Sequence, residues 1–147
     1  MLTEKEVENF IREYLINNGW VTTNLPKTIG EHGVDITAWH PRWRKIYLIE
    51  AKGDGRNPKT QTQVKHSAFY NLLGQILSRM DKEGNSLNKA RYYAIGIPKK
   101  WENTFKNKIS KMKYGWRLLK LKVFLVSNNG KVEEKPYSYF LKNKQKS

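Results

Sequence analysis

The sequence predicts one α/β domain in which a mixed β-sheet is flanked by helices. Three observations support this prediction. The length of 147 residues is typical of a single domain. Helical and β-type patterns follow one another in the order α-β-β-β-α-β-α-β. Residues 46–49 are apolar on both faces, which is typical of a central rather than an edge strand. We therefore expect one domain at residues 1–141 and a basic, flexible tail at 142–147.

The first half of the chain contains a helix followed by three short strands. Thr3 and Glu6 form a capping-box pattern, and apolar residues then recur at helical spacing from Val7 until the polar run 17–19. Three runs of β-type composition come next, with a turn-rich connection at 26–33 between the first two: 20–23, 34–39 and 45–51.

The second half alternates helices and strands. The stretch 53–63 contains Gly, Asp, Asn, Pro and Thr with little to bury, so we expect a mobile loop. Apolar residues at every fourth position predict a long helix from about Thr62 to Met80. The remaining expected elements are a strand at 91–97, a helix from 101 to near 115, strands at 118–126 and 131–134 around a tight turn at 128–130, and a strand or short helix at 137–141.

The charge is strongly positive and unevenly distributed. The net charge is +15, and residues 1–50 contain six basic and seven acidic side chains, 51–100 ten and three, and 101–147 twelve and three. Such a surface attracts polyanions, of which nucleic acids are the commonest inside cells. An anionic membrane and a merely solubilising excess of lysine are the alternatives. We favour nucleic acid, because few acidic side chains are present to pair with the lysines and arginines.

Several classes of protein are excluded by composition. The chain has no Cys, which removes disulfides, thiolate zinc sites, iron–sulfur clusters and cysteine nucleophiles. The N-terminal residues carry acids rather than an apolar leader, and no apolar run is long enough to span a bilayer. We therefore expect a soluble, cytoplasmic protein without a membrane partner.

Three charged residues stand near the ends of predicted strands. Asp35 lies early in the second strand, while Glu50 and Lys52 are two residues apart at the end of the central strand, so the latter two are expected to point to the same side of the sheet. Charges in such positions are costly to desolvate unless they are paired or bind a metal. Mg²⁺ prefers hard oxygen ligands, which Asp35, Glu50 and the backbone carbonyl of Ala51 could supply.

An acid-x-Lys triplet is not specific by itself, because about two are expected by chance in a chain of this composition. Two are present, Glu50–Lys52 and Glu133–Lys135. Only the first follows an apolar strand and precedes a Gly-containing loop, whereas the second lies in a polar stretch before Pro136. Context therefore selects Glu50–Lys52.

The run Gly33–Asp35 (GVD), followed by Ile49–Gly53 (IEAKG), resembles the active-site hairpin of the PD-(D/E)XK nuclease superfamily. Glu8, with Gly-Trp at 19–20, is placed as in the archaeal-type Holliday junction resolvases. The superfamily name suggests Pro before the first acid, but this sequence has Val there.

A second part of the chain is similar to the XisH-type excision-controlling proteins. In that branch, a helix bearing a Gly-Gln pair precedes a strand that ends in Pro, as residues 68–77 and 91–98 do here. The two resemblances together cover about residues 3–113.

The resemblance implies a restriction-endonuclease-like fold and Mg²⁺-dependent hydrolysis of DNA, with Mn²⁺ as a substitute. The catalytic residues it implies are Asp35, Glu50, Lys52 and Gln75. The metal ligands it implies are Glu8, Asp35, Glu50 and the backbone carbonyl of Ala51. Two nearby carboxylates would stabilise the ammonium form of Lys52, so we favour a positioning role for it over proton abstraction. The amide of Gln75 would hold a water or a phosphate oxygen.

Two functions stay open. The leading one is a metal-dependent DNA endonuclease, in its structure-selective form a homodimer that resolves branched DNA. The alternative is a DNA-binding or excision-control protein that keeps the scaffold without cleaving. The presence of both acids and Lys52 favours the enzyme. The expected nucleic-acid contacts are Arg56, Lys59, Lys65, Lys106 and Lys108.

The histidines and several aromatic residues say less about function. His32, His40 and His66 lack partners at ligand spacing and are expected not to bind metal. Trp39 and Trp43, like Tyr47, fit packing and base stacking equally well.

The charge count gives a first test. Binding to DNA is expected to weaken by orders of magnitude between about 50 and 200 mM salt, because each neutralised phosphate releases condensed counterions. Fluorescence anisotropy of labelled duplex DNA measures this dependence. An affinity that does not change with salt would contradict an electrostatic interface.

Overall fold

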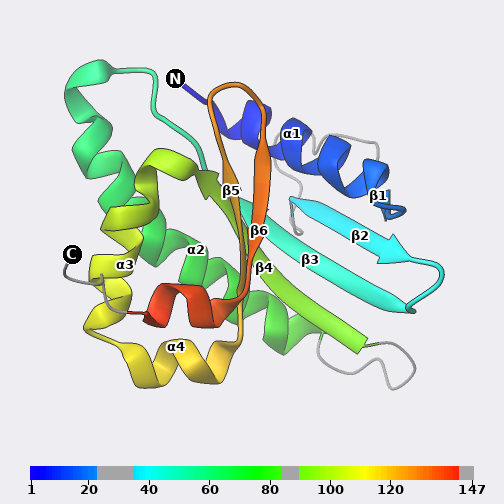
Figure 1. The fold of residues 1–147 in the computed structure, drawn as a ribbon. Helices are drawn as coiled ribbons and strands as arrows, with labels where there is room; N and C mark the ends of the chain where they lie inside the picture. Colours follow the sequence, from blue (N-terminus) through cyan, green and yellow to red (C-terminus); the bar gives the residue numbers. More distant parts are fainter. Residues whose placement is uncertain (23–34, 84–89, 143–147) are drawn as a thin grey trace.

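The computed structural model describes residues 1–22, 35–83 and 90–142 (Figure 1). Its α-helices are α1 (Glu4–Asn17), α2 (Gln61–Glu83), α3 (Glu102–Ser110) and α4 (Lys113–Leu119). Its strands are β1 (Val21–Thr22), β2 (Ile36–His40), β3 (Lys45–Ala51), β4 (Ala90–Pro98), β5 (Lys122–Val126) and β6 (Val132–Lys135). Short 3₁₀ helices occupy Pro58–Thr60, Lys99–Trp101 and Tyr137–Leu141.

The six strands form one mixed sheet in the order β1-β2-β3-β4-β5-β6. The pairs β1–β2, β2–β3 and β5–β6 are antiparallel, whereas β3–β4 and β4–β5 are parallel. Strand β3 is central, and its side chains from Tyr47 to Ala51 are all buried. The α/β prediction and the prediction of a flanked mixed sheet are therefore confirmed.

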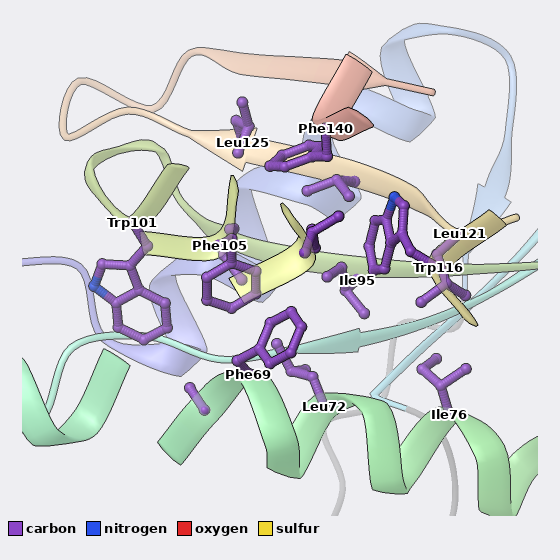
Figure 2. Packing of buried hydrophobic residues seen from close by; sticks show 14 residues of the cluster. Phe69, Leu72, Ile76, Ile95, Trp101, Phe105, Trp116, Leu121, Leu125 and Phe140 are labelled. Atoms are coloured by element: carbon purple, nitrogen blue, oxygen red, sulfur yellow. The ribbon is translucent and has the colours of Figure 1, made fainter. Parts of the chain in front are cut away.

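Helices cover both faces of the sheet (Figure 1). Helix α1 packs on one face through Val7, Ile11 and Leu15, against apolar side chains of β2, β3 and β5. Helices α2, α3 and α4 pack on the other face. Figure 2 shows this second core, in which Phe69 and Leu72 of α2 meet Phe105 of α3 beneath the sheet. Both layers exclude water from apolar surface, which is the main stabilising contribution to the fold.

The sequence identifies α1 and β3 well. Thr3 and Glu6 form both hydrogen bonds of the capping box, and the helix ends beside Gly19, whose φ of +88° is strained for other residues. The turn at 128–130 is also present, with Gly130 at φ +89°. The connection at 26–33 and most of the tail lie outside the described residues.

The expected helix 101–115 is two helices, and the next strand is shorter than predicted. Helix α3 ends at Ser110, and α4 carries Leu118 and Leu119, which the sequence places in a strand. The left-handed backbone of Lys120 (φ 51°) ends α4, and β5 begins at Lys122. A local apolar run does not distinguish a helix end from a strand start, which explains the misplacement.

The start of the expected loop 53–63 is tied to the N-terminal segment. The Leu2 amide donates to Asp54 Oδ2 (3.0 Å), and the Asp54 amide donates to the Leu2 carbonyl (2.6 Å). A Cβ at Gly53 would overlap the backbone of Leu2, Thr3 and Glu4. Glycine is therefore required where the chain leaves β3 and passes under α1.

A polar cluster links β3 to β6 on the α1 face. Glu134 accepts hydrogen bonds from the hydroxyls of Tyr47 (2.8 Å) and Tyr14 (3.2 Å) and pairs with Lys122 (3.1 Å). Burial raises the pKa of Tyr47 to about 12, with Lys122 opposing the shift and Glu134 adding to it. The phenol thus stays a hydrogen-bond donor at neutral pH.

The close approach at Gly53 predicts a large cost for a single methyl group. Gly53→Ala should destabilise the fold by about 1–3 kcal/mol, because backbone must move to admit the Cβ. Gly74→Ala is the control, since no atom of the described residues beyond its own stretch of helix lies within 4 Å of its added Cβ. Urea unfolding measures both; equal midpoints would contradict the tight contact.

Candidate functional site

Asp35 directly precedes β2 and Glu50 lies near the end of β3, so both belong to the same end of these paired strands. Ile36 pairs with Ile49, and continuing this antiparallel register by one residue sets Asp35 opposite Glu50. Residues opposite one another project to the same face, with Cβ atoms about 4.5–5.5 Å apart. Asp35 Oδ2 accepts a hydrogen bond from the Ala51 amide (2.8 Å), which fixes the carboxylate against the end of β3.

Glu50 is a buried acid. Its residue is 1% exposed, and its Oε1 lies 3.3 Å from Nε of Arg79 on α2. A buried carboxylate is stable only with a partner of this kind. The guanidinium thus connects the end of β3 to the helix that covers this face of the sheet.

Gln75 lies one helical turn before Arg79 on α2, so both side chains project from one side of the helix. Its Oε1 is buried and has no hydrogen-bond partner among the described residues. An amide oxygen left in this way is rare in folded proteins and is usually satisfied by a bound water, ion or ligand.

Lys52 differs from its expected placement. The sequence predicts that Glu50 and Lys52 point to one side of the sheet, but Glu50 meets α2 while Lys52 Nζ pairs with Glu4 of α1 at 3.2 Å. The alternation of side chains applies within a strand, and Lys52 follows the last residue of β3. Its amide still donates to the Gly96 carbonyl (3.0 Å), so the backbone continues alongside β4.

Glu8 is connected to the site through Arg12. The Glu8 carboxylate lies 3.8 Å from Arg12 Nη1, and Arg12 Nη2 donates to the Asp35 carbonyl (3.0 Å). Helix α1 therefore reaches Asp35 by a cation rather than by the acid itself. The assignment of Glu8 as a metal ligand stays a prediction.

The donor atoms suit a hard cation. Carboxylate oxygens such as those of Asp35 and Glu50, and amide oxygens such as that of Gln75, are ligand types that Mg²⁺ takes, with waters filling its other positions. Within residues 1–22, 35–83 and 90–142, no group of three or more His, Cys, Asp or Glu side chains could hold a metal. The residues that fit are thus the pair Asp35 and Glu50, with the Ala51 carbonyl beside them.

A polar cavity of about 270 Å³ lies next to this end of the sheet. Asp54 is buried at its wall and pairs with Lys100 at 2.7 Å, and Lys65 also lines it. The other lining residues are Gln61, Thr62 and Trp101. Lys100 is thus already engaged by Asp54, and Lys65 is the second basic residue of the lining, close to the loop that follows β3.

The five expected nucleic-acid contacts lie on two parts of the fold. Arg56 and Lys59 are exposed between β3 and α2, and Lys65 lines the cavity. Lys106 and Lys108 lie on α3 instead, where their ammonium groups stand over the rings of two tyrosines, at 4.2 Å from Tyr139 and 4.6 Å from Tyr70.

Sequence reasoning missed Arg12, Arg79 and Asp54. The sequence could have indicated Arg79, because it follows Gln75 by four residues and therefore lies on the same side of the helix. The contact of Arg12 with a backbone carbonyl, and that of Asp54 with the Leu2 amide, leave no local signal in the sequence.

The chain thus folds as an α/β protein with a mixed sheet flanked by helices, and Asp35 and Glu50 lie at the same end of its paired strands β2 and β3. No protein family matches the chain, and no curated protein matches it. The crystal structure of an XisH family protein from Nostoc punctiforme PCC 73102 is similar in fold, with 19% identity, coverage of 86% of this chain and 95% of that one, and a TM-score of 0.54. A fdxN element excision controlling factor protein from Anabaena variabilis also matches, with 16% identity, coverage of 88% and 95%, and a TM-score of 0.40.

In the described part of the chain, no helix is both long and apolar enough to cross a membrane.

The buried ion pair gives a stability test. Arg79→Met should destabilise the protein by about 3 kcal/mol or more, because it removes the guanidinium beside a buried carboxylate. Adding Glu50→Gln should recover part of that loss, since the neutral amide is cheaper to bury. Denaturant unfolding of both single variants and the double variant measures the coupling. Additive losses would show that the two groups do not interact.

Proposed function

We propose that the protein is a Mg²⁺-dependent endonuclease that hydrolyses DNA phosphodiester bonds, on a fold of the restriction-endonuclease type. The observation that carries the proposal is that Asp35 and Glu50 lie at the same end of the paired strands β2 and β3, with the Asp35 carboxylate bound by the Ala51 amide. Lys52 follows β3 at that end of the sheet, where its ammonium pairs with Glu4 of α1. The net charge of +15 supports a polyanionic substrate. The likeness in fold to the XisH family protein is compatible with this function and with its alternative.

Each residue has a role that its contacts support. Asp35 and Glu50 would hold the metal, which when bound supplies a Lewis acid that stabilises charge developing on the phosphate. The Ala51 amide holds Asp35 in place, so this ligand needs no reorganisation. The Lys52 side chain is 28% exposed and pairs with the exposed acid Glu4, so it is able to turn from Glu4 toward a scissile phosphate. Gln75 Oε1 is placed to accept a hydrogen bond from a water.

In the chemical step, water would attack phosphorus and form a new P–O bond as it loses a proton to solvent. The bond to the leaving oxygen would break, and that oxygen would take up a proton from solvent. Lys52 as a fixed cation offsets negative charge on the phosphate in this step. Arg79 lies against the same carboxylate that the metal would use, at 3.3 Å. Activity therefore depends on how Glu50 is shared between the guanidinium and the metal.

Loss of either acid should abolish cleavage without abolishing binding. Asp35→Asn and Glu50→Gln are expected to reduce cutting of duplex and branched DNA in Mg²⁺ or Mn²⁺ by about 100-fold or more, because each removes a charge that holds the metal. Glu133→Gln is the matched control from the second acid-x-Lys triplet. Gel assays of labelled DNA report cleavage, and anisotropy in EDTA reports binding. Cutting that survives Asp35→Asn contradicts the proposal.

The second candidate is a DNA-binding or excision-control protein that does not cleave. The contact that favours it is the Arg79–Glu50 pair, because a guanidinium at a metal ligand competes with a divalent cation. In this case the wild-type protein would bind DNA yet leave linear, nicked and four-way DNA intact in Mn²⁺. Calorimetric titration with Mn²⁺ separates the candidates, since only the enzyme requires binding that Glu50→Gln weakens.

A further inference from the structure

The turn between β2 and β3 carries an exposed aromatic side chain among several basic ones. We define the hairpin tip as residues 40–45, the segment that joins the two strands in Figure 1. Strand β3 runs from this tip to the Asp35–Glu50 pair, so the two sites lie at opposite ends of one strand, about 20 Å apart at about 3.3 Å per residue.

Trp43 is held in a defined orientation at the tip. Its ring stacks on His40 with centroids 3.9 Å apart and planes at 11°. The amides of Arg42 and Trp43 both donate to His40 Nδ1, at 3.2 and 3.3 Å. His40 is itself buried and meets the ring of Trp20 edge-on at 5.0 Å. One face of the Trp43 indole therefore rests on a fixed imidazole that is continuous with the core.

Trp43 is nevertheless 56% exposed. A tryptophan that served only packing would bury most of its ring, since burial is where a large aromatic gains stability. Here, the supporting contacts fix the indole while leaving much of it in water. This is the arrangement of a preorganised stacking surface rather than of a core residue.

The surroundings of Trp43 are cationic. Arg42 and Arg44 are exposed on either side of it, and Lys45 Nζ lies 5.9 Å from the Trp43 ring and 5.1 Å from that of Tyr92. No acid occurs in the sequence from residue 36 to residue 49. Arg44 adopts a left-handed φ of 52°, so the turn holds a backbone shape that this residue type rarely takes. Aromatic faces among cations complement a chain of bases and phosphates.

We propose that the hairpin tip is a base-stacking platform, on which Trp43 stacks with an unpaired base of a nucleic acid while Arg42 and Arg44 contact the flanking phosphates. The proposal rests on the nucleic-acid part of the proposed function and not on cleavage. It assigns the tip to single-stranded stretches, because bases inside a blunt duplex present no free face to the indole. The platform thus gives the protein a preference for DNA with unpaired segments.

The test compares two DNA probes in EDTA, where no metal-dependent cutting can occur. Fluorescein-labelled oligothymidylate supplies unpaired bases, and a blunt duplex of equal charge supplies none. Trp43→Ala should weaken binding of oligothymidylate by about 5-fold or more and change duplex affinity by less than about 2-fold. Trp43→Phe keeps an aromatic face and should retain most of the affinity. Tyr114→Ala is the control, because Tyr114 on α4 is also an exposed aromatic (75%).

Tryptophan emission provides a second readout that does not depend on the alanine variant folding. Oligothymidylate should quench the emission of the wild-type protein, and most of this quenching should be lost in Trp43→Phe although the probe still binds. Equal quenching in both proteins would overturn the proposal.

The outcomes separate this inference from the function on which it rests. If the wild-type protein binds neither probe, the nucleic-acid function fails and the platform fails with it. If it binds both and Trp43→Ala behaves like wild type, only the platform is refuted. Equal losses on oligothymidylate and duplex would refute it as well, as would a Trp43-dependent affinity for anionic phospholipid vesicles in place of oligothymidylate.

Discussion

The end of β3 is organised by the need to neutralise one buried carboxylate. Glu50 ends a run of apolar residues that lie between two helical layers, where an isolated charge would not be tolerated. Arg79 meets it from α2, while the Ala51 amide next to it holds Asp35. The requirement to neutralise Glu50 therefore ties the end of β3 to α2, and a separate hydrogen bond ties Asp35, just before β2, to the same end of β3. The same requirement makes this region a candidate for chemistry, since a metal ion and a guanidinium satisfy a buried acid in similar ways.

Sequence patterns predicted those elements whose structure depends on residues close together in the chain. The capping box of α1, the apolar β3 and the glycine turn at 128–130 each depend on neighbours in sequence, and each is present. The break between α3 and α4 was missed because the apolar spacing continues through it. The side taken by Lys52 was also missed, since it depends on where the N-terminus of α1 lies.

At the candidate site, the acids could be predicted but not their cationic partners. Glu50 stands out because a charge near the end of an apolar strand is unusual, and antiparallel pairing of β2 with β3 leaves Asp35, the residue before β2, at the same end. Arg12 and Arg79 come from helices whose docking angles are set by the whole core, so their contacts are tertiary. A metal ion at Glu50 would therefore compete with Arg79 for the carboxylate.

The strand order determines which face of the sheet each helix covers. Each parallel strand is added on the same side of its predecessor, and right-handed crossovers in one direction place their helices on a common face. Helices α2, α3 and α4 accordingly share one face, and α1 packs on the other. The handedness of the crossovers thus places three of the four described α-helices on one face of the sheet. The turn between β2 and β3, which carries Trp43, extends toward solvent.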